Sequence, residues 1–159
     1  MAVAVADTDV ARRGRELSFR FAADCAAPGA ARDAVELALG ELDAGARLTA
    51  GLLARALVAI CVSDRGGIVR AELTPGPERV LVEITGAGDG FRLPAARDMI
   101  DELCLTDADP RPAGWRSYLL DRLADDWGID SEYEVAWFEV DHASDSPRRM
   151  GTQHAAVLA

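Results

Sequence analysis

A broad apolar stripe of helical spacing runs from Leu48 to Val62, and it limits the chain to folds in which a helix lies flat on a sheet. Its apolar residues recur every three or four positions, which places them on one side of a helix. They are Leu48, Leu52, Leu53, Ala56, Leu57 and Ile60. A side this wide needs a broad apolar partner, and we expect a β-sheet to supply it.

Strands are predicted on both sides of this helix, where apolar and polar residues alternate. The alternation predicts five strands, at residues 17–21, 68–73, 80–85, 127–132 and 134–141. Helical spacing predicts three further helices, at residues 30–42, 94–103 and 115–126. Pro28 and Gly29 are expected to break the chain before the first of these, and the run Asp43–Gly45 to end it. This order predicts an α/β fold, a two-layer α/β sandwich in which a mixed, mostly antiparallel sheet carries helices on one face.

One domain is expected from a length of 159 residues. We expect it to span residues 17–141, after a flexible polar arm at residues 1–16 and before a loose tail at residues 142–159. The arm lacks the long apolar segment of a signal peptide. No stretch of the chain is expected to approach the apolar length of a membrane-spanning helix.

The charge balance bears on the class of partner. Acidic residues outnumber basic ones by 27 to 17, which gives a net charge of −10. This balance argues against nucleic acid and anionic membranes as partners, because phosphate neutralisation needs a basic surface. Every basic residue is arginine and the chain contains no lysine. A Walker-type phosphate loop, a Schiff base and a lysine general base are therefore excluded.

The cysteines and histidines give no sign of a metal or catalytic centre. Cys25, Cys61 and Cys104 are far apart and odd in number, so neither a disulfide framework nor a zinc site is indicated. We expect them to be reduced thiols of a cytoplasmic protein. His142 and His154 have no nucleophile near them in the sequence. No catalytic residue and no metal ligand is predicted.

A glycine-rich string follows the third predicted strand. Ile84–Gly90 reads ITGAGDG, with glycines at alternate positions. Glycines behind a strand let backbone N–H groups approach a phosphate. They also suit a flexible turn that leaves the strand. The turn is favoured, because no lysine, Ser/Thr-Gly turn or helical pattern follows closely enough to complete a known phosphate cradle.

The order of the elements, with several local strings, resembles the GHKL ATPase superfamily. Within it, the chain is most similar to the anti-sigma-factor serine kinases of bacterial partner-switching systems, over residues 17–141. The strongest local match is LLDRLADDWGI (Leu119–Ile129) followed by VAWFEV (Val135–Val140). Actinobacterial members have a helix ending Leu-Ala-Asp-x-Trp-Gly and a closing strand ending Trp-Phe-Glu-Leu. The resemblance implies the Bergerat variety of the two-layer fold.

The resemblance also shows where family chemistry is missing. In the family, the second helix carries Glu-Leu-Val-x-Asn-Ala-x-x-His; its glutamate orients the attacking group and its asparagine binds magnesium. The matching positions here are Ala56, Ile60 and Asp64. Ala56 and Ile60 offer no oxygen to a hard cation, and Asp64 lies two turns from the glutamate position. Magnesium cannot be held here in the family manner.

Two further nucleotide motifs of the family are altered. In Asp-x-Gly-x-Gly, the aspartate accepts a hydrogen bond from the adenine amino group. Gly88 and Gly90 match its glycines, whereas Gly86 stands in place of the aspartate. The later Gly-x-Gly-Leu motif keeps only Gly114, while Arg116 offers a contact to an anion. The resemblance thus assigns Gly88, Gly90, Gly114 and Arg116 to a vestigial nucleotide site.

Side chains around the last predicted helix have two readings. Asp121, Asp125 and Asp126 form an acidic strip, which is a solvated face by default and alternatively a charged partner surface. Trp115 and Tyr118 are packing residues by default. Alternatively, they fill the nucleotide site or present an interface.

The resemblance implies a regulatory protein of a bacterial partner-switching system. It would be a degenerate anti-sigma-factor-like domain that acts by protein binding, with little or no ATP hydrolysis and no cofactor. The implied partners are a sigma factor or an anti-anti-sigma protein, and a homodimer is plausible. The alternative is an ATP-binding anti-sigma factor with serine/threonine protein kinase activity, which needs ATP and magnesium. A third reading is a different small ligand in the remodelled pocket.

Overall fold

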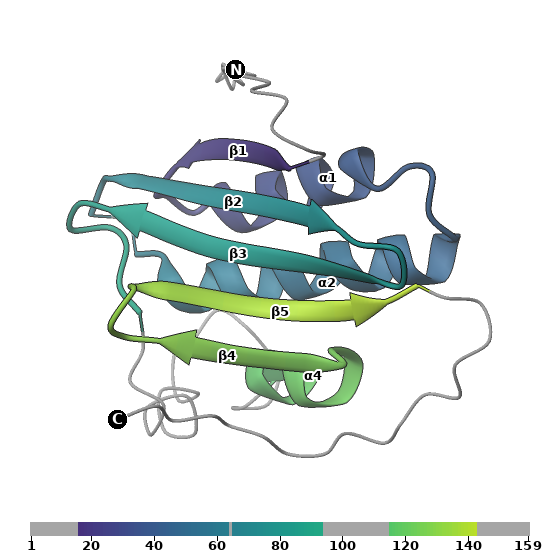
Figure 1. The fold of residues 1–159 in the computed structure, drawn as a ribbon. Coiled ribbons are helices and arrows are strands. Elements are labelled where there is room, and N and C mark those ends of the chain that lie inside the picture. Colours follow the sequence, from purple (N-terminus) through teal and green to yellow (C-terminus); the bar gives the residue numbers. More distant parts are fainter. Residues whose placement is uncertain (1–15, 64, 94–114, 143–159) are drawn as a thin grey trace.

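The computed structural model describes residues 16–63, 65–93 and 115–142 (Figure 1). The predicted helix at residues 94–103 lies outside the described residues. The described residues form five strands and three helices. In chain order these are β1 (Leu17–Ala22), α1 (Ala27–Ala38), α2 (Ala44–Cys61), β2 (Ile68–Pro75), β3 (Arg79–Ala87), α4 (Trp115–Leu123), β4 (Asp126–Asp130) and β5 (Val135–Asp141).

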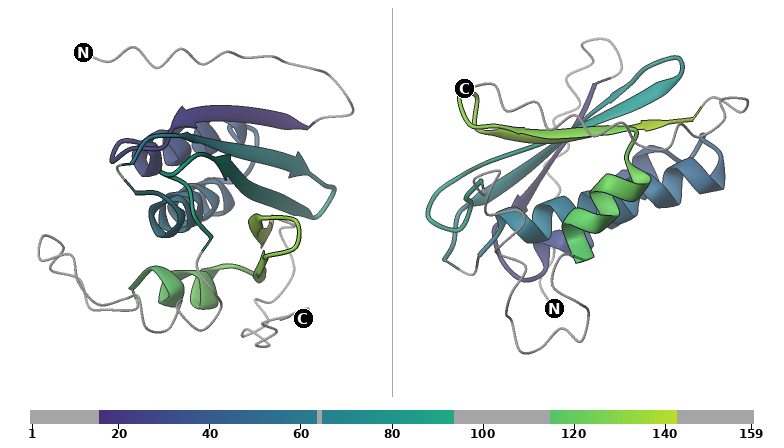
Figure 2. Two further views of the ribbon diagram at one scale, coloured as in Figure 1. Left: turned by 90° about the vertical axis from the view of Figure 1, so that its left-hand side faces the viewer. Right: turned by 90° about the horizontal axis from the view of Figure 1, so that it is seen from below.

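The sheet has the order β1-β2-β3-β5-β4, and all four pairings between these strands are antiparallel. The three described helices lie on one face of the sheet, as the view from below shows (Figure 2). The predicted two-layer α/β sandwich, with a mostly antiparallel sheet and helices on one face, is therefore confirmed. The pair α1 and α2 connects the neighbouring strands β1 and β2.

Two helix starts differ from the prediction, and each has its own local cause. α1 begins at Ala27, so Pro28 lies in its first turn instead of before it. Proline is tolerated there because a first-turn N–H has no partner within the helix. α2 begins at Ala44, because the Asp43 carboxylate accepts a hydrogen bond from the Ala46 N–H at 3.0 Å. The run that was expected to end α1 therefore starts α2.

Two helix ends also come earlier than predicted. α1 ends at Ala38 rather than at residue 42. α4 ends at Leu123 rather than at residue 126, because Asp125 is already bonded to β5. Its N–H donates to the Glu139 carbonyl oxygen at 2.9 Å, and its carboxylate accepts from the Asp141 N–H at 2.7 Å. These bonds draw the chain out of the helix and into the sheet.

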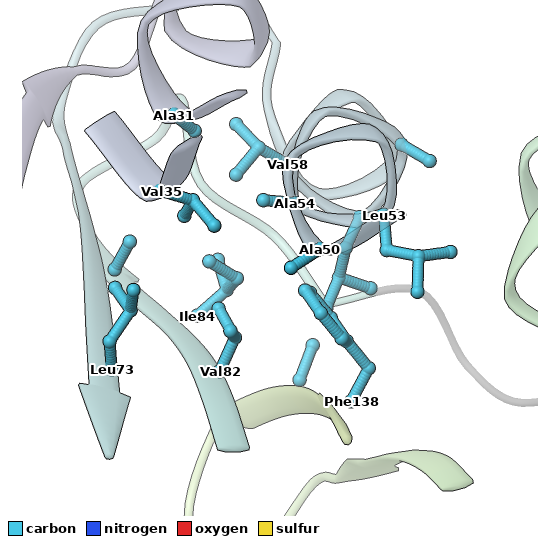
Figure 3. Close-up of a cluster of buried hydrophobic side chains, with 14 of the residues drawn as sticks. Ala31, Val35, Ala50, Leu53, Ala54, Val58, Leu73, Val82, Ile84 and Phe138 are labelled. Carbon is cyan, nitrogen blue, oxygen red and sulfur yellow. The ribbon is translucent and has the colours of Figure 1, made fainter. Parts of the chain in front are cut away.

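The core lies between the helices and the inner face of the sheet (Figure 3). Leu53 and Leu57 of α2 are fully buried, and so are Val82, Ile84 and Phe138 of the sheet. No polar or charged residue is buried within the described ranges. The predicted helix stripe and the period-two strand patterns thus meet in one apolar layer, except for Leu48, which was predicted in the stripe but is 53% exposed.

The expectation that no stretch of the chain approaches the apolar length of a membrane-spanning helix is wrong. Within the described residues, Ala44–Cys61 is the one helix long and apolar enough to cross a membrane. Half of this stretch is buried inside the fold, where it packs between α1, α4 and the sheet. It is the core helix of a small, soluble-looking α/β domain.

The outer face of the sheet carries charges of both signs. Glu72 of β2 lies directly opposite Glu83 of β3. Partial burial, and then the charges of Glu72 and Glu16, raise the pKa of Glu83. On the same face, the Arg79 guanidinium forms an ion pair with Glu139 at 3.0 Å. This face is polar, in contrast to the inner one.

The first residue of the predicted tail is bonded to the turn between β2 and β3. His142, the first residue of the predicted tail, donates its N–H to the Glu78 carbonyl oxygen at 2.9 Å. Its ring Nε2 lies 3.0 Å from the Gly76 carbonyl oxygen. His142 is therefore tied to the turn between β2 and β3.

Candidate functional site

The glycine-rich string packs against the turn that follows α2. The Gly90 N–H donates to the Gly66 carbonyl oxygen, and the Ser63 N–H donates to the Gly90 carbonyl oxygen at 2.8 Å. The Arg92 N–H donates to the Cys61 carbonyl oxygen, also at 2.8 Å. The N–H of Gly90 is thus bonded within the protein instead of pointing to a ligand.

Close backbone contact explains why these positions are glycine. Gly88 has a φ of +89°, and a Cβ there would lie 2.9 Å from the Gly67 Cα. A Cβ at Gly90 would overlap the Gly66 carbonyl group. Real Cβ atoms do not come this close to backbone atoms, so both positions require glycine for packing. We call this contact of residues 63 and 65–67 with residues 86–92 the glycine interlock.

Gly86 is a strand residue, and its inner side is filled by an aromatic ring. It pairs with Val69 of β2, which places position 86 on the inner face with Ile84. A Cβ at Gly86 would overlap the ring of Phe91. Phe91 is half-buried and packs against the core. Gly86 is the position that matches the adenine-binding aspartate in the predicted resemblance. The space that a side chain would need there is filled by the ring of Phe91.

The matching positions on α2 are apolar and packed. Ala56 is 4% exposed and belongs to the core, and Ile60 is half-buried against it. Neither side chain has an oxygen for a cation. Asp64 and Gly114 lie outside the described residues. Within the described ranges, no group of three His, Cys, Asp or Glu side chains is placed to hold a metal ion.

Four of the predicted site residues line two separate pockets. The first has a volume of about 310 Å³ and lies between the start of α1, the middle of α2 and the start of α4. It brings Ala56 and Arg116 together. The second has a volume of about 360 Å³ and is lined by Gly86 and Gly88. Ile60 and Gly90 line neither of the two.

Two residues of these pockets were missed by sequence reasoning. Phe91 could have been found, because the alternation of Val82 and Ile84 continues to Gly86 and leaves a gap for the next large apolar residue. Arg55 is exposed beside Ala56 and lines the first pocket. Its position beside Ala56, at the edge of the apolar stripe, could have indicated that it borders a pocket on α2.

The two described cysteines differ in their surroundings. Cys25 is exposed and lines the first pocket. Cys61 is buried at the end of α2, and this burial raises the pKa of its thiol to about 12. Cys61 is therefore a neutral, unreactive thiol at physiological pH. Cys104 lies outside the described residues.

The acidic strip on α4 and β4 contributes to the fold. The Asp121 carboxylate accepts a hydrogen bond from the indole N–H of Trp127 at 2.9 Å. Asp125 accepts from β5, as described above. Tyr118 is half exposed, with the Arg122 guanidinium 5.3 Å from its ring centroid. Asp121 therefore joins α4 to β4, and Asp125 joins the link between α4 and β4 to β5.

The likeness to the GHKL superfamily rests on the motifs alone and stays a prediction. No protein-family model and no curated protein matches this sequence. The described residues form a two-layer α/β domain with an antiparallel sheet, and they line the two pockets described above.

Proposed function

We propose that this chain is a regulatory protein of a bacterial partner-switching system, a degenerate anti-sigma-factor-like GHKL domain that acts by protein binding. The observation that carries the proposal is the ring of Phe91 on Gly86. In the family, an aspartate at this position reads adenine. Here a ring takes the space of any side chain, so the base has lost its polar contact.

The chemistry of α2 supports the same proposal. A magnesium ion takes oxygen ligands, and the matching positions carry Ala56 and Ile60 instead of glutamate and asparagine. Both side chains pack against an apolar core. Little or no ATP hydrolysis is therefore expected, and no cofactor.

The partner proposed is a sigma factor or an anti-anti-sigma protein in the cytoplasm. A net charge of −10 complements the basic, DNA-binding surface of a sigma factor. The same charge opposes direct binding of nucleic acid. A homodimer is part of the proposal, by analogy with the family.

Nucleotide binding is the first test. The purified chain is titrated with a fluorescent ATP analogue, with and without magnesium, and unlabelled ATP is added as a competitor. No saturable, competitor-sensitive binding at micromolar concentration is expected. Magnesium-dependent binding, with phosphate transfer to a partner protein, would instead support the alternative, an ATP-dependent serine/threonine protein kinase.

Protein binding is the second test. Proteins that co-purify with the tagged chain from its native cells are identified, and each complex is rebuilt from purified components. A saturable complex with a sigma factor or an anti-anti-sigma protein, formed without nucleotide, is expected. If every rebuilt complex needs ATP, or if neither class of protein binds, the proposed function is wrong.

A further inference from the structure

The two edges of the sheet differ in how well they are protected against pairing. β4, at one edge, contains Asp126, Gly128 and Asp130, and residues of these types disfavour the addition of another strand. β1, at the other edge, pairs with β2 along its whole length without a bulge (Figure 1). It contains no proline or glycine, and its one charged residue is Arg20. Among the described residues, none forms a hydrogen bond to the outer edge of residues 17–21, so this edge is open to a further strand.

The inner row of β1 side chains is apolar and incompletely covered. Leu17, Phe19 and Phe21 lie opposite three fully buried residues of β2 and pack against the core. All three are nevertheless only partly buried, because no described strand lies beyond them. An extended segment placed along β1 would cover these side chains and would also satisfy the open backbone groups.

The charged residues at the two ends of the outer row each lie near a charge of their own sign. Arg20 is exposed and lies directly opposite Arg70 of β2. Glu16, just before β1, is also exposed. Partial burial, and then the charges of Glu72 and Glu16, raise the pKa of Glu83, so these three carboxylates lie on one face. Like charges opposite each other destabilise a sheet, and neither Arg20 nor Glu16 forms an ion pair within the described residues.

A second copy of the same segment supplies both missing partners. Residues 16–20 read ELSFR, with opposite charges at the two ends and Ser18 in the middle. When two such segments run antiparallel with Ser18 opposite Ser18, Glu16 lies opposite Arg20 of the partner subunit. The same register places Leu17 opposite Phe19 of the partner subunit, on the inner face. A shift by one residue would set apolar side chains against charged ones, and a shift by two would separate the charge pairs.

We propose that two copies of the chain form a twofold dimer by antiparallel pairing of β1 with β1, in the register fixed by two Glu16–Arg20 pairs. The two sheets then join into one. A pairing over residues 16–20 is small beside the roughly 1,200–2,000 Å² of a stable interface, so the expected dissociation constant is on the order of 10–100 μM. The proposal gives an interface to the homodimer of the proposed function and rests on that part of it alone.

The test is sedimentation velocity of the purified full chain from about 5 μM to about 500 μM, a range that brackets the expected dissociation constant. Arg20→Glu and Glu16→Arg each set like charges opposite each other, and each should weaken the dimer about tenfold. They change the net charge in opposite directions, so a general charge effect cannot explain both losses. When the two variants are mixed, the opposed charges again differ in sign, and association should return. Arg55→Glu, at an exposed position on α2, is the matched control. Circular dichroism checks that each variant is folded.

Three outcomes would overturn the proposal. The chain sediments as a monomer at every concentration, or Arg55→Glu weakens the dimer as much as Arg20→Glu does. In the third, the mixed variants associate no more tightly than each variant does alone, which would mean that Glu16 and Arg20 are not opposed. The experiment contains neither a partner protein nor a nucleotide. Its failure would therefore remove the homodimer and leave the proposed binding of other proteins to its own tests.

Discussion

Gly86 packs against the ring of Phe91, and this contact opposes a side chain at position 86 in addition to the missing carboxylate. The ring of Phe91 lies where a side chain at position 86 would project. The motif comparison suggests Ala56→Glu, Ile60→Asn and Gly86→Asp as the changes that would restore magnesium–ATP binding. The contact implies that these three are insufficient until Phe91 is also replaced.

Gly86→Asp is predicted to lower the free energy of unfolding by about 2–4 kcal/mol, because it displaces the Phe91 ring and buries a carboxylate beside it. Ala87→Asp, at the exposed next residue, should change it by less than about 0.5 kcal/mol. Urea unfolding monitored by circular dichroism measures both.

The Phe91→Ala background tests whether the contact is the cause. Removing the ring makes room, so Gly86→Asp should lower the free energy of unfolding less in this background than in the natural protein. Equal losses in the two backgrounds would show that the ring is not what excludes a side chain at position 86.

The buried thiol of Cys61 is expected to make the free energy of unfolding depend on pH. Its pKa in the folded protein is about 12, against an ordinary value of 9.0. Above pH 9 the thiol therefore ionises in the unfolded chain first, and the free energy of unfolding falls by up to about 1.4 kcal/mol per pH unit until the folded pKa is passed. Stability is fully present below pH 9.

Urea unfolding at about pH 8 and pH 10.5 measures this loss, which should be about 2 kcal/mol from Cys61 alone. Cys61→Ala should reduce the loss, whereas Cys25→Ala, at an exposed thiol, should leave it unchanged. The three proteins differ only at the two thiols, so the difference between them isolates Cys61. The same loss in Cys61→Ala would contradict the assignment.

Site residues were predictable from the sequence only in part. The absence of oxygen ligands at Ala56 and Ile60 could be read directly, because it depends on residue type. The separation of Ala56 and Gly86 into different pockets could not, because it depends on how α2 lies across the sheet. Nor could the place of Arg55 in the first pocket, where its neighbours come from three helices.

At the scale of whole elements, strands were easier to predict than helix ends. Buried strand residues alternate strictly, as in Val80, Val82 and Ile84, so the inner face of β3 follows from the sequence. Helix ends depend on single contacts between a side chain and the backbone. Asp43 reads equally well as a residue after one helix or before the next, and only its bond to the Ala46 N–H decides.

Asp43→Ala is predicted to lower the free energy of unfolding by about 1 kcal/mol, because it leaves the Ala46 N–H at the start of α2 without its acceptor. Asp43→Asn keeps an oxygen acceptor and should cost much less. Chemical denaturation of the three proteins measures this. If Asn and Ala lower stability equally, the side chain does not cap the helix.

A Gly→Ala change inside the glycine interlock and one outside it are predicted to have opposite effects on stability. Gly90→Ala forces a methyl group into the Gly66 carbonyl and should destabilise by about 1–3 kcal/mol. Gly29→Ala lies in α1 with no atom within 4 Å of the new methyl, and should stabilise by about 0.5–1 kcal/mol. Thermal unfolding compares the two. A stabilising Gly90→Ala would show that the two loops do not pack as described.

At the scale of the whole molecule, repulsion between like charges opposes folding. The net charge of the full chain is −10, and the described ion pairs are all at the surface, with at least one partner well exposed. Exposed pairs contribute little to stability. Repulsion between the excess carboxylates is therefore expected to outweigh the attraction within these pairs.

Raising sodium chloride from about 0.05 M to about 0.5 M should consequently stabilise the protein, because it shortens the screening length below the spacing of most surface charges. The urea midpoint at neutral pH measures the change. Potassium glutamate and sodium chloride at equal ionic strength should act similarly if screening is the cause. A midpoint that falls as salt rises would mean that the ion pairs dominate.

The contact of Phe91 with Gly86 also has a consequence for how this sequence can drift. A single mutation that places any side chain at position 86 meets the ring, and a single mutation that removes the ring leaves a hole beside an apolar core. Either single mutation is expected to destabilise the fold, whereas a simultaneous change at both positions avoids the clash and fills the hole. Descendants of this sequence should therefore keep Gly86 and Phe91 together or change both.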